Sequence, residues 1–312
     1  LRLEQPILSN QELQKLRQLD VEGLRSVTLP TVFRVTEGEE ALSQALEELC
    51  ASASQAITDG ATILILSDRT ADSMYAGIPA LLAASAVHHH LIREGTRTRC
   101  GLVVESAEPR ENHHFALLLS YGVGAINPYL AFETLAELHC EHRLKAGLTL
   151  KDVEKNYVKA INKGVTKVMS KMGISTLRSY RGAQIVEAVG LNQEVIDKYF
   201  TWTPSRIGGV GLDVLASEVR MRHEQGYPER RVPDVLELSS GGEYQYRRNG
   251  EHHLTGPLVV AKMQEAVRGE DGKTYKEYAA LVNDQNERHC TLRGLLEFKP
   301  GGEPVPLDEV EP

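Results

Sequence analysis

Short apolar runs alternate with segments of helical spacing through the first half of the chain. The apolar runs are bounded by turn residues or polar clusters and lie at 31–35, 63–66, 101–104 and 123–127. Between the first two runs, Leu42, Leu46 and Leu49 recur at intervals that put them on one face of a helix. Pro79 opens the next helical segment and Gly95 follows its end, as is typical of helix boundaries. Because strands that alternate with helices pair in parallel, this pattern predicts an α/β fold with a largely parallel sheet covered by helices.

The second half of the chain is more helical. Residues 149–173 have the spacing of one long amphipathic helix, or of two helices that meet near Gly164. Thr149 is a plausible N-cap, and Asp152 stands at the position that completes a capping box. A short β-type run that leads into a helix, and a glycine-rich turn that precedes another helix, are expected at 174–191 and 205–212.

The composition changes after Gly226. The following stretch, "YPERRVPDVLELSSGGEYQYRRNGEHHLTG", is rich in proline, glycine and charged residues, which is typical of a boundary or an extended surface segment. Two further helices and a Pro/Gly/acid tail without an apolar pattern close the chain. We therefore predict a domain at 1–226 and a separate segment at 227–312.

Polar residues follow two of the predicted strands directly. Ser67, Asp68 and Arg69 end one apolar run, and Glu105 and Ser106 end the next. In parallel α/β proteins, functional groups gather at the carboxyl edge of the sheet. These residues are accordingly candidate functional groups, although each of them alone is equally well explained as a cap of the helix that follows.

Five histidines stand close together, in "AVHHHLIREG" and at His113 and His114. Neighbouring residues of a helix point about 100° apart, so three consecutive histidines do not converge on one metal ion. Helical metal pairs need a spacing of three or four, as in HExxH, and that motif is absent from the sequence. Packing and hydrogen bonding at helix or domain contacts is therefore the preferred interpretation, and a metal site is the alternative.

The glycine-rich stretch "SRIGGVGL" allows a phosphate cradle as well as a tight turn. It matches neither GxGxxG nor a P-loop, so spacing alone does not decide between the two. "SKMGISTLRSYRGAQ" is dense in hydroxyl and basic side chains and is suited to binding an anion or another domain. The sequence has no GxSxG elbow, and no catalytic triad can be assembled from it.

Composition excludes several classes of protein. The formal net charge is −8 and no basic stripe is present, so a nucleic-acid partner is not expected. No apolar run approaches 18 residues and no signal peptide is visible, so we expect no membrane partner and a cytoplasmic location. The four cysteines are Cys50, Cys100, Cys140 and Cys290, which are too dispersed to suggest an iron–sulfur cluster.

Long stretches of the chain resemble the glutamate synthase large subunit. "LSDR", "AVHHHLIREG", "LVVESAEPRENHHFALLLSYG", "KVMSKMGISTLRSYRGAQIVEAVGL" and "TPSRIGGVGL" are similar to its central domain. The segments "GGEYQY", "YKEYAALVN" and "TLRGLLEFKP" resemble the opening of its FMN domain. The likeness implies a distorted or incomplete TIM-barrel-like fold with a helical second half.

The resemblance also implies a role within a larger enzyme. That enzyme converts L-glutamine and 2-oxoglutarate to two L-glutamate, and it is an oxidoreductase driven by NADPH or ferredoxin. In the family, an amidotransferase domain releases ammonia, which crosses a tunnel to an FMN domain that also holds a 3Fe-4S cluster. A small NADPH/FAD subunit is a further partner. The central domain binds no cofactor itself, packs between the other domains and helps to form the tunnel.

Residues at the tunnel or at domain interfaces follow from the same likeness. They are expected to be Ser67, Asp68, Arg69, Glu105, Ser106, His113, Lys171, Tyr180, Arg181, Ser205 and Arg206. The chain lacks an N-terminal nucleophilic cysteine and the family's flavin-binding segments, so the fragment alone is expected to be inactive. Two alternatives stay open: a stand-alone FMN-linked enzyme with phosphate at "SRIGGVGL", and a separate structural subunit of a multi-chain synthase.

Overall fold

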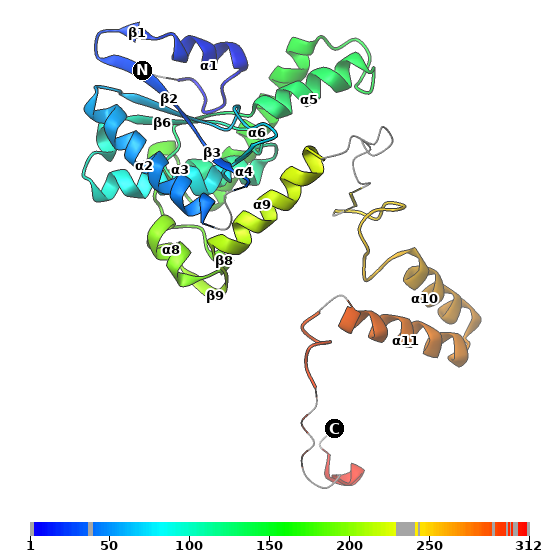
Figure 1. Ribbon diagram of the computed structural model, residues 1–312. Helices are drawn as coiled ribbons and strands as arrows, with labels where there is room; N and C mark the ends of the chain where they lie inside the picture. Colours follow the sequence, from blue (N-terminus) through cyan, green and yellow to red (C-terminus); the bar gives the residue numbers. More distant parts are fainter. Residues whose placement is uncertain are drawn as a thin grey trace. The chain divides into compact units, whose positions relative to one another are not determined.

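The computed structural model describes residues 3–36, 40–228, 241–242, 244–288, 291–297, 299, 301 and 305–310. The chain divides into two compact units, Leu1–Glu229 and Arg230–Pro312 (Figure 1). Among the described residues, no helix combines the length and the apolar character that crossing a membrane requires.

The first unit is built on a five-stranded sheet with the order β1-β2-β4-β6-β7. The strands are β1 (Asp20–Val21), β2 (Leu24–Pro30), β4 (Ile63–Ser67), β6 (Gly101–Glu105) and β7 (Ala125–Asn127). All pairs are parallel except that of β1 with β2. The predicted α/β fold with parallel β/α units is therefore confirmed. The described strands form an open sheet rather than a closed barrel, as expected for an incomplete barrel.

One strand prediction was wrong. Residues 31–35 do not enter the parallel sheet: β3 (Val32–Arg34) pairs antiparallel with β5 (Tyr75–Gly77) in a separate ribbon. The strand beside β4 is instead β2, "LRSVTLP", in which polar residues interrupt the apolar ones and only Leu29 is fully buried. Such a strand lacks the continuous apolar run that marks a fully buried parallel strand, and the sequence pattern therefore passed over it.

The core lies on both faces of this sheet. Leu64, Leu66, Leu102 and Val104 pack with the helices that connect the strands, on the side of α2, α3 and α4. The alternate residues of the same strands pack against α1 and the segment before it: Ile63, Ile65, Val103 and Ala125 contact Leu8, Leu13 and Leu16. An N-terminal helix therefore covers the face that a closed barrel would turn inward (Figure 1).

The helices of the first half follow their predicted segments closely. The predicted ones are α2 (Ala41–Thr58), α3 (Ala80–Arg93), α4 (Asn112–Ser120) and α5 (Tyr129–Cys140), whereas α1 (Asn10–Arg17) and a 3₁₀ turn at Arg97–Arg99 were not predicted. Leu42, Leu46 and Leu49 are buried along one face of α2, as their spacing predicts. The second half contains α6 (Leu150–Lys171), α7 (Leu177–Tyr180), β8 (Ala188–Leu191), α8 (Gln193–Tyr199), β9 (Ser205–Val210) and α9 (Leu212–Gly226).

Helix α6 is continuous through Gly164, and its capping box is confirmed. The Thr149 hydroxyl accepts a hydrogen bond from the Asp152 amide at 3.2 Å, and the Asp152 carboxylate accepts one from the Thr149 amide at 3.1 Å. Gly164 allows close approach of α4, because a Cβ there would lie 2.1 Å from Asn112 Oδ1. This contact explains a glycine inside a long helix, where it would otherwise lower helix stability.

Two predictions in the second half were wrong. The stretch 174–191 begins with the short helix α7 and ends in strand β8, which reverses the expected order. The glycine-rich stretch 205–210 is not a tight turn but strand β9, paired parallel with β8. Gly209 passes so close to β8 that a Cβ would lie 2.1 Å from the Gly190 carbonyl oxygen. Gly209 therefore serves strand contact.

The second unit contains two helices that pack against each other, α10 (Pro257–Gly269) and α11 (Gly272–Arg288). Val259 and Ala266 of α10 are buried, while much of the remaining apolar surface is exposed, including Leu258 and Val267. A 3₁₀ turn follows at Leu307–Glu309. Both helices were predicted.

Candidate functional site

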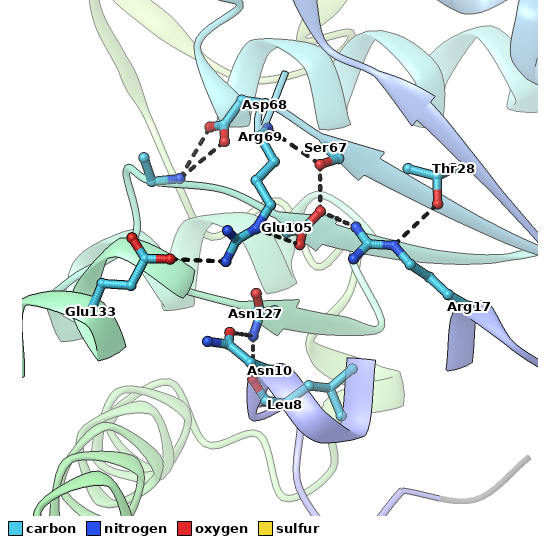
Figure 2. Close-up of polar contacts among 11 residues, drawn as sticks. Leu8, Asn10, Arg17, Thr28, Ser67, Asp68, Arg69, Glu105, Asn127 and Glu133 are labelled. Atoms are coloured by element: carbon cyan, nitrogen blue, oxygen red, sulfur yellow. Dashed lines mark hydrogen bonds and ion pairs between the residues drawn. The ribbon is translucent and has the colours of Figure 1, made fainter. Parts of the chain in front are cut away.

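The carboxyl edge of the parallel sheet brings three polar side chains into one row. Ser67, Glu105 and Asn127 are the last residues of β4, β6 and β7, and the strand register pairs Ser67 with Glu105 and Glu105 with Asn127. All three are buried. The expectation that strand ends converge is therefore correct in geometry. The immediate surroundings of this row decide what chemistry it supports (Figure 2).

Glu105 is the centre of this edge. Its side chain is only 2% exposed, and its carboxylate forms ion pairs with Arg17 of α1 and with Arg69, the latter at 3.1 Å from Nε. The Ser67 hydroxyl donates a further hydrogen bond to the same carboxylate (Figure 2). Two guanidinium groups and a hydroxyl thus satisfy an acid that burial alone would destabilise. The arrangement is a closed, neutralised network rather than a free general base.

Arg69 links this network to the following helix. Its Nη2 lies 3.1 Å from the Glu133 carboxylate of α5, and its guanidinium stacks 4.2 Å from the centre of the Tyr129 ring. The Arg69 side chain remains 41% exposed, so it is the one member of the Glu105 network with a large solvent-facing part. Arg69 is accordingly the strand-end residue best placed to meet another molecule or domain.

A second carboxylate, Asp68, is held separately. The Ser106 hydroxyl donates to Asp68 Oδ2 at 2.5 Å, and the Ala107 amide donates to both carboxylate oxygens at 3.1 and 3.2 Å. Burial raises the pKa of Asp68, and the hydrogen bonds from Ser106 and Tyr129 act in the opposite direction. Burial and the neighbouring Asp68 charge raise the pKa of Tyr129. The phenol therefore stays protonated and suits donation to Asp68 rather than proton transfer.

Asn127 closes the row on the side of the N-terminal segment. Its amide nitrogen donates to the Leu8 carbonyl and to Asn10 Oδ1, each at 2.9 Å. Its Oδ1 is buried and accepts no hydrogen bond from any described residue. This oxygen is therefore a buried acceptor at the sheet edge without a donor among the described residues.

The other predicted site residues do not join this edge. His113 is exposed on α4, Lys171 is exposed at the end of α6, and Tyr180 is buried with its hydroxyl donating to the Ala116 carbonyl at 3.2 Å. Ser205 and Arg206 lie on β9, where Arg206 is exposed and 3.6 Å from Glu187. These residues are spread over several surfaces of the first unit.

Arg181 lines a cavity of about 940 Å³ at the opposite, amino edge of the sheet, with Arg178 and the first residues of β4, β6 and β7. Burial lowers the pKa of Arg181. The residues predicted for the tunnel or interface thus fall into separate groups, and only the five strand-end residues lie together at one edge of the sheet, in two hydrogen-bonded sets around Glu105 and Asp68.

The consecutive histidines each contact a different part of the structure. His88 Nδ1 accepts a hydrogen bond from Arg97 Nε at 2.9 Å, His89 Nδ1 lies 3.0 Å from the Ser85 carbonyl oxygen, and His90 Nε2 lies 2.8 Å from the Ser54 hydroxyl. Their divergence is what helix geometry predicts. Across the described residues, no three His, Cys, Asp or Glu side chains gather as a metal site would require.

Sequence reasoning missed Arg17, Glu133 and Tyr129. Arg17 lies 88 positions before its partner Glu105, in a helix that the apolar pattern did not mark. Glu133 and Tyr129 stand in the first turns of α5, where a charged or aromatic residue carries no special signal. The available signal was Glu105 itself: a carboxylate at the end of a buried strand needs a basic partner, so a search for an arginine or lysine able to reach it was warranted.

Comparison with known proteins gives a consistent result. The model of the glutamate synthase central domain family matches residues 1–192. The glutamate synthase [NADPH] large chain of Bacillus subtilis is 41% identical over 311 residues, which cover 100% of this chain and 20% of that protein. The glutamate synthase [NADH] of Schizosaccharomyces pombe is 39% identical and is covered to 15%. The ferredoxin-dependent glutamate synthase of Pyropia yezoensis is 38% identical and is covered to 20%.

Similarity to solved structures is weaker. A flavocytochrome b2 mutant with benzoylformate aligns over 55% of this chain and 37% of its own, at 11% identity and a TM-score of 0.36. This score is too low to support an argument about function. The chain spans only 15–20% of the length of the three relatives described above.

Proposed function

Because this chain belongs to the glutamate synthase central domain family, we propose that it is the non-catalytic central segment of a glutamate synthase. The complete enzyme would convert L-glutamine and 2-oxoglutarate to two L-glutamate. The segment would pack between an amidotransferase domain and an FMN domain and help to form the passage for ammonia. In the cell we place it in the cytoplasm, where the unpaired Cys50, Cys100 and Cys140 would stay reduced.

This proposal rests on how the chain aligns with its relatives. All of the chain aligns at about 40% identity with glutamate synthases named for NADH, NADPH and ferredoxin. In each it corresponds to only 15–20% of the polypeptide. A segment common to enzymes with different electron donors suits a role in connecting domains better than a role in electron transfer.

The carboxyl edge of the sheet supports a non-catalytic role. In barrel enzymes this edge holds the catalytic groups, which stay accessible to substrate. Here Glu105 is covered by α1 and neutralised by Arg17 and Arg69, and Asp68 is enclosed by Ser106 and Ala107. Such closed networks stabilise the fold and the position of Arg69.

An ammonia passage along this edge fits the chemistry of its side chains. Neutral ammonia is lost by protonation in water, so a passage must exclude bulk water, and charged groups in its wall must already be paired. Asn127 Oδ1 is a buried acceptor without a donor among the described residues. Ser67, Asp68, Arg69, Glu105 and Ser106 would form the wall beside it. Of the remaining predicted residues, Lys171, Arg181, Ser205, Arg206 and His113 would lie at contacts with other domains, whereas Tyr180 is buried within the first unit.

The cofactors of the complete enzyme, FMN and a 3Fe-4S cluster, would be held outside this segment. An iron–sulfur cluster needs converging thiolates, whereas Cys50, Cys100 and Cys140 lie on separate elements, and Cys290 is outside the described residues. The glycine-rich stretch is strand β9, which pairs with β8. We assign no cofactor-binding residue here. A small NADPH/FAD subunit would be a further partner.

The first test is the size of the native polypeptide. An antibody against this segment should detect a band several times larger than 34.5 kDa in extracts of the source cells. A band near 34.5 kDa would contradict the proposal. It would favour a stand-alone protein, which should then be examined for bound flavin and for separate partner subunits.

The tunnel assignment has its own test in the complete enzyme. Arg69→Ala should increase the glutamine hydrolysed per reductive turnover, because ammonia would escape from a disturbed wall. Arg143→Ala is the matched control, since that arginine is 68% exposed and pairs with the neighbouring Glu141. If Arg69→Ala leaves the ratio unchanged, the wall does not involve this residue, whereas family membership would stand.

A further inference from the structure

A mostly apolar pocket of about 400 Å³ opens on the first unit beside α3. Ile92 and Tyr121 form one part of its wall, and Gln184, Val186 and Trp202 form another. These residues come from α3, the end of α4 and the segments that lead into β8 and β9. The pocket is distinct from the Glu105 network and from the Arg181 cavity.

Trp202 dominates the surface of this pocket. It is the only tryptophan of the chain, and 80% of it is exposed. Ile92 beside it is 49% exposed. Tryptophan has a large apolar surface, so leaving it exposed forgoes much of the stabilisation that its burial would give. It is also enriched where proteins contact one another.

Backbone strain is concentrated at the same place. Gln184 has φ +56° and Trp202 has φ +65°, so two non-glycine residues in the left-handed region line one pocket. A bulky residue in that region is an outlier, and such conformations gather at sites that bind. The conformation of Trp202 therefore needs a reason beyond the chain's own packing.

The polar groups of the wall are neutral or already paired. The hydroxyls of Tyr121 and Thr203 are hydrogen-bonded to each other at 2.6 Å. Burial lowers the pKa of His88 and His89, which leaves both imidazoles uncharged at neutral pH. Arg93 is the only permanently charged lining residue. The wall accordingly favours an apolar group with an acidic neighbour that faces Arg93.

Strands β8 and β9 carry further exposed apolar residues. Val189 of β8 and Ile207 of β9 are register partners, yet they are 65% and 61% exposed. Parallel strands are normally buried, because their apolar faces need cover. The pocket-lining residues Ile92, Val186 and Trp202 are together called the Trp202 surface below.

We propose that the Trp202 surface is the docking site of another domain of the same long polypeptide, which inserts an apolar side chain, flanked by an acidic residue, into the pocket. This inference rests on the proposed function. The length of the relatives supports this occupant, because four-fifths or more of each lies outside the matched segment.

Hydroxyl-radical footprinting tests the inference directly. In the 312-residue chain Trp202 should be oxidised rapidly, and in the full-length polypeptide its oxidation should fall to the level of Tyr180, which is 1% exposed in the chain itself. Equal oxidation of Trp202 in both proteins would overturn the docking site. That result would leave the proposed function intact if the native band is large, whereas a native band near 34.5 kDa would reject the proposed function itself.

A pair of substitutions in the full-length polypeptide gives a second readout. Trp202→Ala should increase the rate at which a protease cuts between domains, because a side chain central to the contact is lost. Met221→Ala removes another apolar side chain, 60% exposed on α9, and should leave the rate unchanged. Equal rates for both variants would contradict the proposal. Because Trp202 is exposed in the chain alone, its removal should not unfold the first unit.

Discussion

Glu105 of β6 and Arg17 of α1 form an ion pair across 88 positions of sequence, and this pair fastens the N-terminal helix to the carboxyl edge of the sheet. The carboxylate is almost fully buried, whereas Arg17 and Arg69 both reach solvent. The edge of the sheet therefore depends on one acid with two basic partners. Removing the acid should cost more stability than removing a surface charge.

Glu105→Gln should lower the free energy of unfolding by about 3 kcal/mol, because breaking a buried ion pair leaves its partners uncompensated. Chemical denaturation of the 312-residue chain measures this change. Glu133→Gln is the matched control: it removes the other carboxylate that contacts Arg69, but Glu133 is 49% exposed and should contribute less than about 0.5 kcal/mol. Equal losses for the two variants would show that burial does not control the strength of this network.

Two adjacent glycines of β9 should respond differently to alanine. A Cβ at Gly209 would lie 2.1 Å from the Gly190 carbonyl oxygen, whereas a Cβ at Gly208 meets no atom within 4 Å. Gly209→Ala should destabilise the chain by about 3 kcal/mol through overpacking, and Gly208→Ala should change stability by less than about 0.5 kcal/mol. Thermal unfolding of both variants measures the difference. A tolerated Gly209→Ala would contradict the close approach of β8 and β9.

His88 should make the chain sensitive to acid. Burial lowers its pKa from the ordinary 6.5 to about 3, and the positive Arg97 acts in the same direction. Below pH 6.5 the His88 imidazole is therefore protonated in the unfolded chain but stays neutral in the folded chain. Stability is fully present above pH 6.5 and is lost as the pH falls toward 3, by about 1.4 kcal/mol per unit for this one group.

His88→Asn tests this dependence, because an asparagine oxygen can accept the hydrogen bond from Arg97 without titrating. The variant should lose less stability than the parent chain between pH 6 and pH 4. His89 and His90, whose pKa values burial also lowers, are present in both proteins and cancel from the difference. Parallel curves of denaturation midpoint against pH would mean that His88 is not the group responsible.

The contribution of the α6 capping box to the free energy of unfolding should be measurable separately from that of the core. Thr149→Ala removes the hydroxyl that accepts from the Asp152 amide and should lower the free energy of unfolding by about 1 kcal/mol. Thr166→Ala is the control within the same helix, since its exposed hydroxyl only donates to the Asn162 carbonyl, and it should be nearly neutral. Urea denaturation of both variants distinguishes a cap from a general effect of losing threonine.

The predicted and observed elements differ for identifiable reasons. Strands β4, β6 and β7 were found because both of their faces are covered, which makes each one a continuous apolar run. Strand β2 was not predicted, because polar and partly exposed residues interrupt its apolar positions. Strand β9 was not predicted, because its glycines are typical of a turn. Gly209 is instead required by the close contact with β8.

By itself, the sequence determined the α/β class, most of the helices with the cap at Thr149, the convergence of strand-end polar groups, and the family. These features depend on local spacing and on motifs that neighbouring residues carry. Only the tertiary structure decided that Arg17 neutralises Glu105, that β9 pairs with β8, and that Trp202 stands exposed over an apolar pocket. Each of these depends on packing between segments far apart in the chain. Such contacts produce no regular spacing of apolar and polar residues, so the sequence pattern does not reveal them.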